Sequence, residues 1–269
     1  MGVLIKKLLV FDIDKNNGKP TPWVNYSFIL LNVLVFCFLQ QFGTNSNFTY
    51  SFANVPAEIL SGNDFVTDPL VITSEEPSGI NHIAQMPALA ATPIPVWLTL
   101  VTSFFMHNGW SLLIANMLLL FLLGNKLETW LGHTRYFLFY IFGGILAGIC
   151  YAAAVYFLDE NMLLPWVGAS GALSAVIGGY IISSSEQRVS LFSSNVRVPL
   201  FIIMMVWLAV QVINGSGLPG GVDISGAAFA PQVVGFIAGL FLIKVFFLKK
   251  SRAYKYLFQA HHSTSKATS

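Results

Sequence analysis

Six apolar stretches separated by shorter polar segments set the pattern of this sequence. Each is long enough to cross most or all of a bilayer as a helix, and none carries a charged residue in its middle. We expect membrane spans at approximately residues 24–42, 110–125, 136–157, 168–184, 198–213 and 231–247. The pattern therefore predicts an all-α polytopic membrane protein with six transmembrane helices.

Composition points to the same class of protein. The chain has 269 residues, of which 55% are hydrophobic and only 10% are charged, and its mean hydropathy is +0.68. A soluble domain of this size needs a more polar surface than these residues can supply. The first ten residues lack a small-residue cleavage site, so we expect the first span to act as an uncleaved signal anchor.

The distribution of charge predicts the orientation of the spans. Cytoplasmic loops of membrane proteins collect Lys and Arg. If the N-terminus lies inside, all fourteen basic residues fall on the cytoplasmic side, which predicts that both termini are cytoplasmic. The segments expected outside hold eight acids and no Lys or Arg; these acids are Glu58, Asp64, Asp68, Glu75, Glu76, Asp159, Glu160 and Asp223.

The spans divide the chain into three parts. We expect a cytoplasmic N-terminal segment at 1–22, a membrane domain at 23–249, and a cytoplasmic tail at 250–269 that is first basic and then rich in Ser and Thr. The membrane domain has one long connection, the first outer loop at about 43–109. Its stretch "TSEEPSGINHIAQMPALAATPIP" has no clear helical or strand period, so an ordered cap and a mobile flap both remain open.

The apolar run at 96–123 has length for more than one span, but a second crossing would put the later basic residues outside. Asn108-Gly109 interrupts the run instead. We therefore expect residues 95–109, with Trp97, Phe104 and Phe105, to lie on the outer interface or to dip into it.

Several functional classes are disfavoured by what the spans lack. None has an ionisable residue in its middle, which argues against an ion- or proton-coupled transporter. The five histidines show no metal-ligand spacing, so we expect no metal site and no cofactor. Cys37 and Cys150 lie inside spans and are expected to pack there, and His82 is expected to be an exposed loop residue.

The fourth and sixth spans carry faces of small residues. These include Gly168, Gly171 and Gly178 on the fourth and Gly235 and Gly239 on the sixth. Small residues let transmembrane helices approach closely, so we expect the two spans to touch. Ser170 would then face Gln232, which follows Pro231 in the first turn of its helix. A serine on such a face commonly serves packing alone, but the helix start at Ser170 also offers free N–H groups for an oxyanion.

The sequence resembles the rhomboid intramembrane serine proteases. "GASGA" is similar to the GxSG serine motif of that family, and "FMHNGWSLLIANM" resembles its HGGWxHLxxNM segment. "GNKLETWLGHTRYFLFYIFGG" resembles the GNxxExxxGxxxFxxFY stretch, and "VVGFIAGLF" resembles the end of the sixth-span AHxGGxxAG motif. The resemblance covers roughly residues 20–250, and it implies a six-transmembrane-helix rhomboid-like bundle with an active site in an outer, water-filled cavity.

The resemblance also implies roles for individual residues. Ser170 occupies the position of the nucleophile, and Asn116 that of the side-chain oxyanion donor, although an interhelical hydrogen bond is an alternative role for Asn116. Glu128 resembles a structural hydrogen-bonding residue at the inner end of the second span. Catalysis would use no metal and no cofactor.

Two positions depart from the family pattern. Gln232 stands where the family has its histidine base, and Leu112 stands where it has a second-span histidine. A carboxamide hydrogen-bonds a serine but does not take its proton near neutral pH. His107 is kept and is a minor candidate for a replacement base. Gln232 is either a single substitution engineered to trap a substrate or the residue of a natural relative that has lost proteolysis. Leu112 favours the natural relative, because a trapping variant would change one catalytic residue only.

The expected function is therefore that of a rhomboid pseudoprotease that binds transmembrane segments of client or partner proteins. The rivals are an active intramembrane serine endopeptidase with Ser170 as nucleophile, and a structural subunit of a larger membrane complex. The expected partners are transmembrane segments and the lipid bilayer, with no nucleic acid. We expect the protein in the inner membrane of a bacterium, with the long first loop on the outer side.

Overall fold

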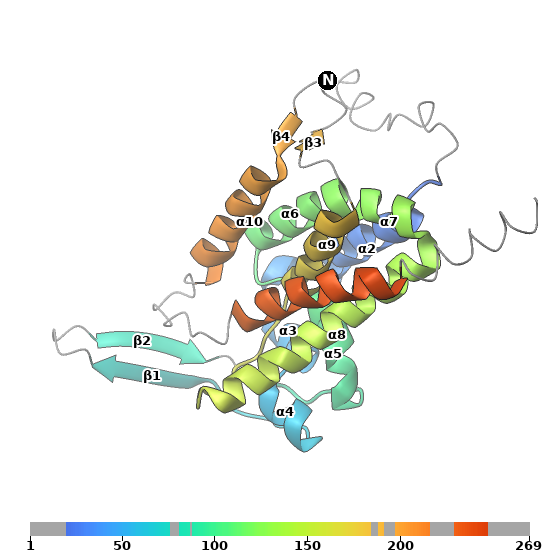
Figure 1. Cartoon of the computed structure of the whole chain (residues 1–269). Helices are drawn as coiled ribbons and strands as arrows, with labels where there is room; N and C mark the ends of the chain where they lie inside the picture. Colours follow the sequence, from blue (N-terminus) through green and yellow to red (C-terminus); the bar gives the residue numbers. More distant parts are fainter. Residues whose placement is uncertain are drawn as a thin grey trace, which may run out of the picture.

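A computed structural model describes residues 20–75, 81–86, 88–183, 188–190, 197–215 and 229–246. The predicted N-terminal segment, except residues 20–22, and the predicted tail lie outside the described residues. The chain is mainly helical, and its long helices form a bundle from which one β-ribbon projects (Figure 1). The bundle helices are α2 (Trp23–Leu34), α6 (Trp110–Leu119), α7 (Asn125–Leu131), α8 (His133–Phe157), α9 (Ser170–Ser183), α10 (Leu200–Gly215) and a C-terminal helix (Phe229–Phe246).

Three helices in the described part of the chain are long and apolar enough to cross a membrane. They are Trp110–Leu131, which joins α6 and α7, then α8, and then the C-terminal helix. Shorter apolar helices cover Trp23–Leu39, Val96–Phe105 and Ser170–Ser183. The helices thus coincide with the predicted apolar stretches, while the number of crossings stays a prediction.

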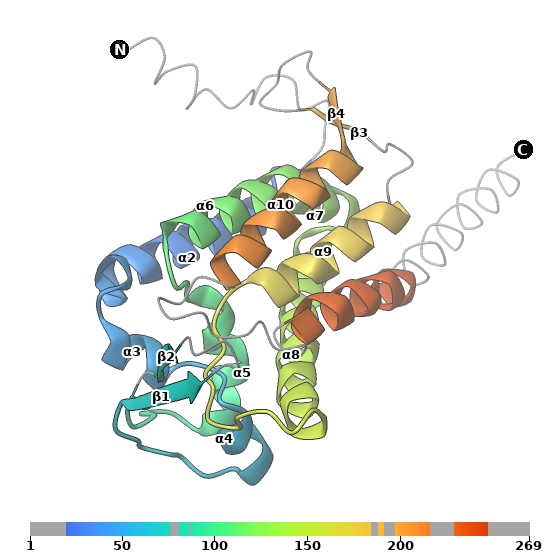
Figure 2. The same cartoon turned by 90° about the vertical axis from the view of Figure 1, so that its left-hand side faces the viewer.

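Helix α9 forms the centre of the bundle. Every residue from Ser170 to Tyr180 is buried, and Figure 2 shows α9 between α10 and the C-terminal helix. Glycines make this burial possible: a Cβ on Gly235 would overlap the carbonyl oxygen of Gly171, and one on Gly239 would overlap that of Ala175. Backbones in such close contact gain dispersion energy that the hydrophobic effect does not supply inside a bilayer.

Buried polar groups join α2 to the helix pair α6–α7. Two π-helical turns interrupt the regular pattern, Val35–Leu39 after α2 and Leu120–Gly124 between α6 and α7. Asn25 Nδ2 donates to the carbonyl oxygen of Leu120 at 2.9 Å, and Tyr136 donates to Asn25 Oδ1 at 2.6 Å. Such side-chain partners satisfy backbone groups that a local break in the helical ladder frees.

Glu128 ties the start of α2 to α7. Its fully buried carboxylate accepts the backbone N–H groups of Val24 at 3.1 Å and Asn25 at 2.6 Å. His133 Nδ1 lies 2.5 Å from the same carboxylate. A carboxylate at a helix start satisfies orphan N–H groups and interacts favourably with the helix dipole, so Glu128 has the structural hydrogen-bonding role expected of it.

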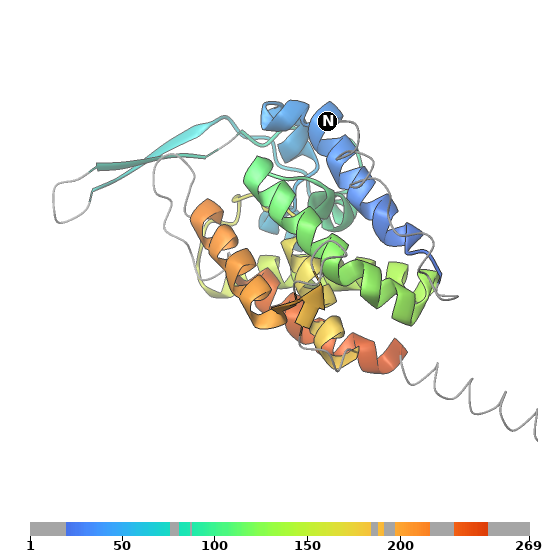
Figure 3. The same cartoon turned by 90° about the horizontal axis from the view of Figure 1, so that it is seen from above.

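The long connection at about 43–109, which the sequence predicts to be the first outer loop, contains helices and strands in its described part. It contains a 3₁₀ turn (Gln41–Gly43), α3 (Ser46–Ser51), α4 (Pro56–Ser61), and an antiparallel ribbon of β1 (Leu70–Glu75) and β2 (Asn81–Met86). Figures 1 and 3 show the ribbon projecting sideways from the bundle. Next to the ribbon, the Thr67 N–H donates to the carbonyl oxygen of Leu89, whose side chain is buried. The sequence pattern did not predict these strands, because their polar and apolar residues do not alternate regularly.

The segment Val96–Phe105 is helical, with α5 (Thr99–Thr102) between two 3₁₀ turns, Val96–Leu98 and Ser103–Phe105. About half of the surface of Trp97 is exposed, whereas Phe104 is fully buried against Gly144. The segment therefore contributes to the core as well as to the surface, and its position at the membrane interface stays a prediction. A second short ribbon, β3 (Arg188–Ser190) with β4 (Arg197–Pro199), connects α9 and α10.

Candidate active site

Ser170 is the first residue of α9, and hydrogen bonds from the segment at 43–109 to the chain just before α9 fix its position. Asn54 and Trp166 exchange backbone hydrogen bonds at 3.0 and 2.9 Å, and Gly168 N–H donates to Ser103 at 3.0 Å. Gly168 has a φ of +131°, which favours glycine, so its role is to turn the chain into α9. The sequence placed Gly168 in the packing face; in the structure its added Cβ would meet only the Ser170 hydroxyl.

Gln232 faces Ser170 from the C-terminal helix. Its Nε2 donates to Ser170 Oγ at 3.4 Å, which is a long and weak hydrogen bond. Ser170 is 5% exposed and Gln232 is partly buried. The contacts of Gly235 and Gly239 with α9 bring the two residues together, because they fix the height of the C-terminal helix against α9. The two polar residues therefore meet at the N-terminal ends of a tightly packed helix pair.

Asn116 lies on α6 and is 1% exposed, with both ends of its amide engaged. Trp207 Nε1 on α10 donates to Asn116 Oδ1 at 2.9 Å, and Asn116 Nδ2 lies 3.1 Å from His107 Nε2. An indole N–H donates only, so the atom it meets must be the amide oxygen, and this fixes which way the amide points. The NH₂ group of Asn116 then faces His107 and donates to it.

This arrangement fixes the state of His107. An NH₂ group donates only, so His107 Nε2 must accept, and the ring proton of the neutral imidazole lies on Nδ1. Burial lowers the pKa of His107 to about 3, because a charged imidazolium loses its hydration there. Gln40 holds the residue through its backbone: Gln40 Oε1 accepts its N–H at 2.9 Å, and Gln40 Nε2 donates to its carbonyl at 3.0 Å.

Leu112 lies on α6 one turn before Asn116 and is partly buried. Its hydrocarbon side chain neither donates nor accepts a hydrogen bond. On this turn of α6 the side chain that can donate is that of Asn116, and its role as an oxyanion donor toward Ser170 stays a prediction. The start of α9 supplies free backbone N–H groups.

An apolar groove of about 480 Å³ separates α6 from α10. Figure 3 shows these two helices side by side at the edge of the bundle. The groove is lined mainly by aliphatic side chains, and Trp207 is the aromatic residue in its wall; the lining includes Ser111, Ile114, Leu118, Ile202, Val206 and Trp207. The hydrogen bond from Trp207 to Asn116 thus connects the groove wall to the site.

Comparison with known proteins identifies the family. The model of the Rhomboid domain matches residues 95–249, which is more than half of the chain and includes Ser170, Gln232, Asn116 and His107. The chain belongs to the rhomboid family.

Rhomboid relatives come from a bacterium and a plant. The chain is 28% identical over 222 residues to "Rhomboid protease GluP" of Bacillus subtilis (strain 168), a match that covers 81% of this chain and 36% of the relative. It is 31% identical over 144 residues to "RHOMBOID-like protein 4" of Arabidopsis thaliana, covering 54% of this chain and 34% of that protein. The chain thus spans only about a third of the length of these relatives.

Two residues of this rhomboid site were missed by the sequence analysis. Trp207 and Gln40 hold Asn116 and His107, and neither belongs to a motif. For Trp207 a signal did exist, since an indole N–H inside an apolar span requires an acceptor. For Gln40 the only signal was a polar residue at the end of an apolar stretch.

Proposed function

We propose that this rhomboid is a pseudoprotease that binds transmembrane segments of other membrane proteins. The observation that carries the proposal is the partner of Ser170: within the described residues it is the Gln232 amide. Because the amide nitrogen donates to Ser170 Oγ, it occupies the hydroxyl oxygen and removes no proton. Loss of one member of a serine catalytic set costs on the order of 10⁴- to 10⁶-fold in rate.

His107 does not replace the missing base in this proposal. Its Nε2 accepts from Asn116, and its Nδ1 already carries the ring proton. A pKa near 3 also makes its imidazole a poor proton acceptor at neutral pH. Both properties support a positioning role for His107, in which it orients the Asn116 amide.

The groove between α6 and α10 supports the binding part of the proposal. Its volume of about 480 Å³ and its aliphatic walls suit the side chains on one face of an apolar helix. We propose that a client helix lies along α6 and α10 there, with its outer end near Ser170. The proposal includes six crossings with both termini in the cytoplasm, and a location in a bacterial inner membrane with the first loop outside.

An activity-based label tests the inactivity. We expect no reaction of purified protein with a fluorophosphonate probe above the level of Ser170→Ala, and no cleavage of a model transmembrane substrate in proteoliposomes. Labelling or cleavage that disappears in Ser170→Ala would establish the rival, an active intramembrane serine endopeptidase. Two observations support this alternative: Ser170 is present, and one of the relatives is named as a protease.

The variant Gln232→His tests whether the base alone is missing. Appearance of activity in this variant and not in Gln232→Asn would mean that the rest of the site is intact. Continued inactivity would assign a further defect to Leu112 and its surroundings, and it would leave the wild-type protein a pseudoprotease. Both interpretations hold only if the wild-type protein itself shows no activity.

Photo-crosslinking tests the binding site. A crosslinker at Ile202, which is exposed in the groove, should capture a synthetic single-span peptide in proteoliposomes. The matched control is Phe241, an exposed position on the C-terminal helix. Equal capture at the two positions would contradict groove binding. A stoichiometric protein retained on purification from the native membrane would favour the structural-subunit alternative instead.

A further inference from the structure

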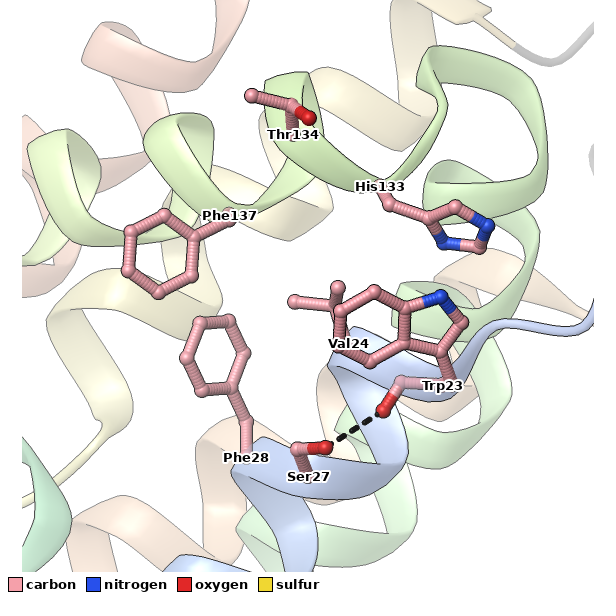
Figure 4. Close-up of a pocket in the computed structure, with 7 residues that line it drawn as sticks. All are labelled: Trp23, Val24, Ser27, Phe28, His133, Thr134 and Phe137. Atoms are coloured by element: carbon pink, nitrogen blue, oxygen red, sulfur yellow. Dashed lines mark hydrogen bonds between the residues drawn. The ribbon is translucent and has the colours of Figure 1, made fainter.

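A second groove, of about 360 Å³, lies between the first turns of α2 and α8 and shares no lining residue with the groove between α6 and α10. Figure 4 shows its two ends, with Phe28 and Phe137 at one and Trp23 and His133 at the other. Val24, Ser27 and Thr134 complete the lining, and the Ser27 hydroxyl donates to the Trp23 carbonyl at 2.8 Å. The groove is therefore apolar along its length and polar at one end.

The polar end offers one hydrogen-bond donor, the indole N–H of Trp23, and one further ring nitrogen, Nε2 of His133. His133 Nδ1 lies 2.5 Å from Glu128, so the ring proton on that side belongs to this pair, and Nε2 is left for a second partner. Trp23 is 56% exposed, its ring centroid lies 5.1 Å from that of His133, and its indole N–H has no partner in the part of the chain that the structure describes. Both groups therefore stand at the mouth of the groove.

The groove opens onto the lipid-facing perimeter. Leu30, Leu31 and Leu34 on α2 are exposed large apolar residues, as are Leu138 and Phe142 on α8. For a membrane-embedded rhomboid, the medium against such a surface is the bilayer. Trp and His at the starts of two apolar helices fit the depth of the headgroups, where aromatic residues with a polar atom concentrate.

Basic residues at this end of the bundle favour an anionic group nearby, although neither of them lines the groove. Arg135 belongs to the first turn of α8, and Lys126 belongs to α7, which lies beside the starts of α2 and α8 in Figure 1; the Lys126 ammonium lies 3.5 Å from the Tyr180 hydroxyl on α9. The nearby acid, Glu128, is fully buried and is occupied by His133 and by two backbone N–H groups. Lys and Arg residues next to a membrane surface attract the anionic headgroups of phospholipids.

We propose that this groove is a binding site for one phospholipid molecule. One acyl chain lies along Phe28 and Phe137, and the phosphate lies at the mouth of the groove, where it accepts a hydrogen bond from Trp23 Nε1 beside the His133 ring. A transmembrane helix is a poorer occupant, since it would bring hydrocarbon against the polar mouth and leave the indole N–H without an acceptor.

Native mass spectrometry of the full chain tests the proposal, with phosphatidylglycerol as probe and diacylglycerol of the same chains as its phosphate-free counterpart. We expect wild-type protein to retain one phosphatidylglycerol with about tenfold preference over diacylglycerol, as hydrogen bonds to a charged group allow. Trp23→Phe keeps the aromatic wall and removes the N–H, so it should reduce that preference severalfold while diacylglycerol retention stays the same. An unchanged preference in Trp23→Phe would overturn the placement of the phosphate.

A groove-filling variant tests the acyl-chain site. Ser27→Trp should abolish the retained lipid, whereas Ile149→Trp, an exposed position on the distant part of α8, should not. If Ser27→Trp retains as much phosphatidylglycerol as wild type, the groove is not the site. Should Ser27→Trp fail to fold, Ser27→Leu with the same readout keeps the test, and equal retention there would again overturn the proposal. The outcome is independent of client binding at α6 and α10.

Discussion

Trp207, Asn116 and His107 form a chain in which the chemistry of each residue dictates the state of the next. The indole donates only, so the amide oxygen of Asn116 faces it; the amide nitrogen then faces His107, whose Nε2 must accept. Burial of all three residues makes each of these bonds costly to lose. The donor that the resemblance assigns to an oxyanion is thus oriented by Trp207 and His107.

Removal of the indole N–H should destabilise this chain. Trp207→Phe leaves Asn116 Oδ1 without its buried donor, at a cost of about 1–3 kcal/mol in the free energy of unfolding. A thermal unfolding scan in detergent should show a lower Tm than wild type. Trp97→Phe is the control, because Trp97 is half exposed, and an equal loss of Tm in both variants would contradict the role of the hydrogen bond.

Glu58 should make the outer loop sensitive to pH. The carboxyl is 2% exposed on α4, and burial raises its pKa from 4.5 to about 7, with Asp64 adding to the rise and the Phe65 N–H opposing it. A raised carboxyl pKa means that the folded loop binds more protons than the unfolded one, so its stability is greatest below about pH 4.5 and falls as pH rises to about 7.

Hydrogen exchange of the segment at 54–68 tests this expectation. Exchange should be slower at pH 5 than at pH 8 after correction for the intrinsic rate. Glu58→Gln stays neutral and should remove the difference. A difference that persists in Glu58→Gln would assign the pH dependence to another group.

At the scale of elements, close contact between α9 and the C-terminal helix determines the site. Ser170 and Gln232 are sixty-two positions apart, and their meeting depends on Gly235 lying against Gly171 and on Gly239 lying against Ala175. In each pair the obstacle to a larger residue is a backbone carbonyl, which does not rotate out of the way. A larger residue at either glycine would therefore push the two helices apart, because no change of side-chain rotamer relieves the overlap with a backbone carbonyl.

Gly235→Val should separate the two helices and break the contact between Gln232 and Ser170. Overpacking at such a position costs about 1–3 kcal/mol or more, so we expect a marked loss of Tm. Val233→Ile adds a methyl group at an exposed position of the same helix and should leave Tm unchanged. A disulfide or crosslink between cysteines at 170 and 232 that forms equally well in Gly235→Val would show that the contact does not depend on the glycine.

At the scale of the whole molecule, the uneven distribution of Lys and Arg supports one orientation of the helices in the membrane. The segments expected outside include the ribbon and α4, and they carry acids without Lys or Arg. The basic residues of the described part lie in or next to α7, the start of α8, the ribbon β3–β4 and the end of the C-terminal helix. A potential across the membrane and the cost of moving Lys and Arg through it keep such a chain in one orientation.

Thiol accessibility tests this orientation in intact cells. In a chain without Cys37 and Cys150, Asn63→Cys should react with a membrane-impermeant maleimide added outside. Lys244→Cys should react only after permeabilisation. The reverse pattern, or equal labelling of both positions, would refute the proposed topology.

The sequence alone predicted the apolar helices, the small faces on two of them, and the family, because long apolar runs and short motifs are local signals. It could not predict the ribbon β1–β2, whose pairing depends on register between residues far from any clear alternation. Tertiary structure alone decided that Trp207 orients Asn116, that His107 is neutral, and that Trp23 and His133 share a groove. These features depend on burial and on hydrogen bonds between residues that are far apart in the sequence, so they follow from the folded structure and not from any local sequence pattern.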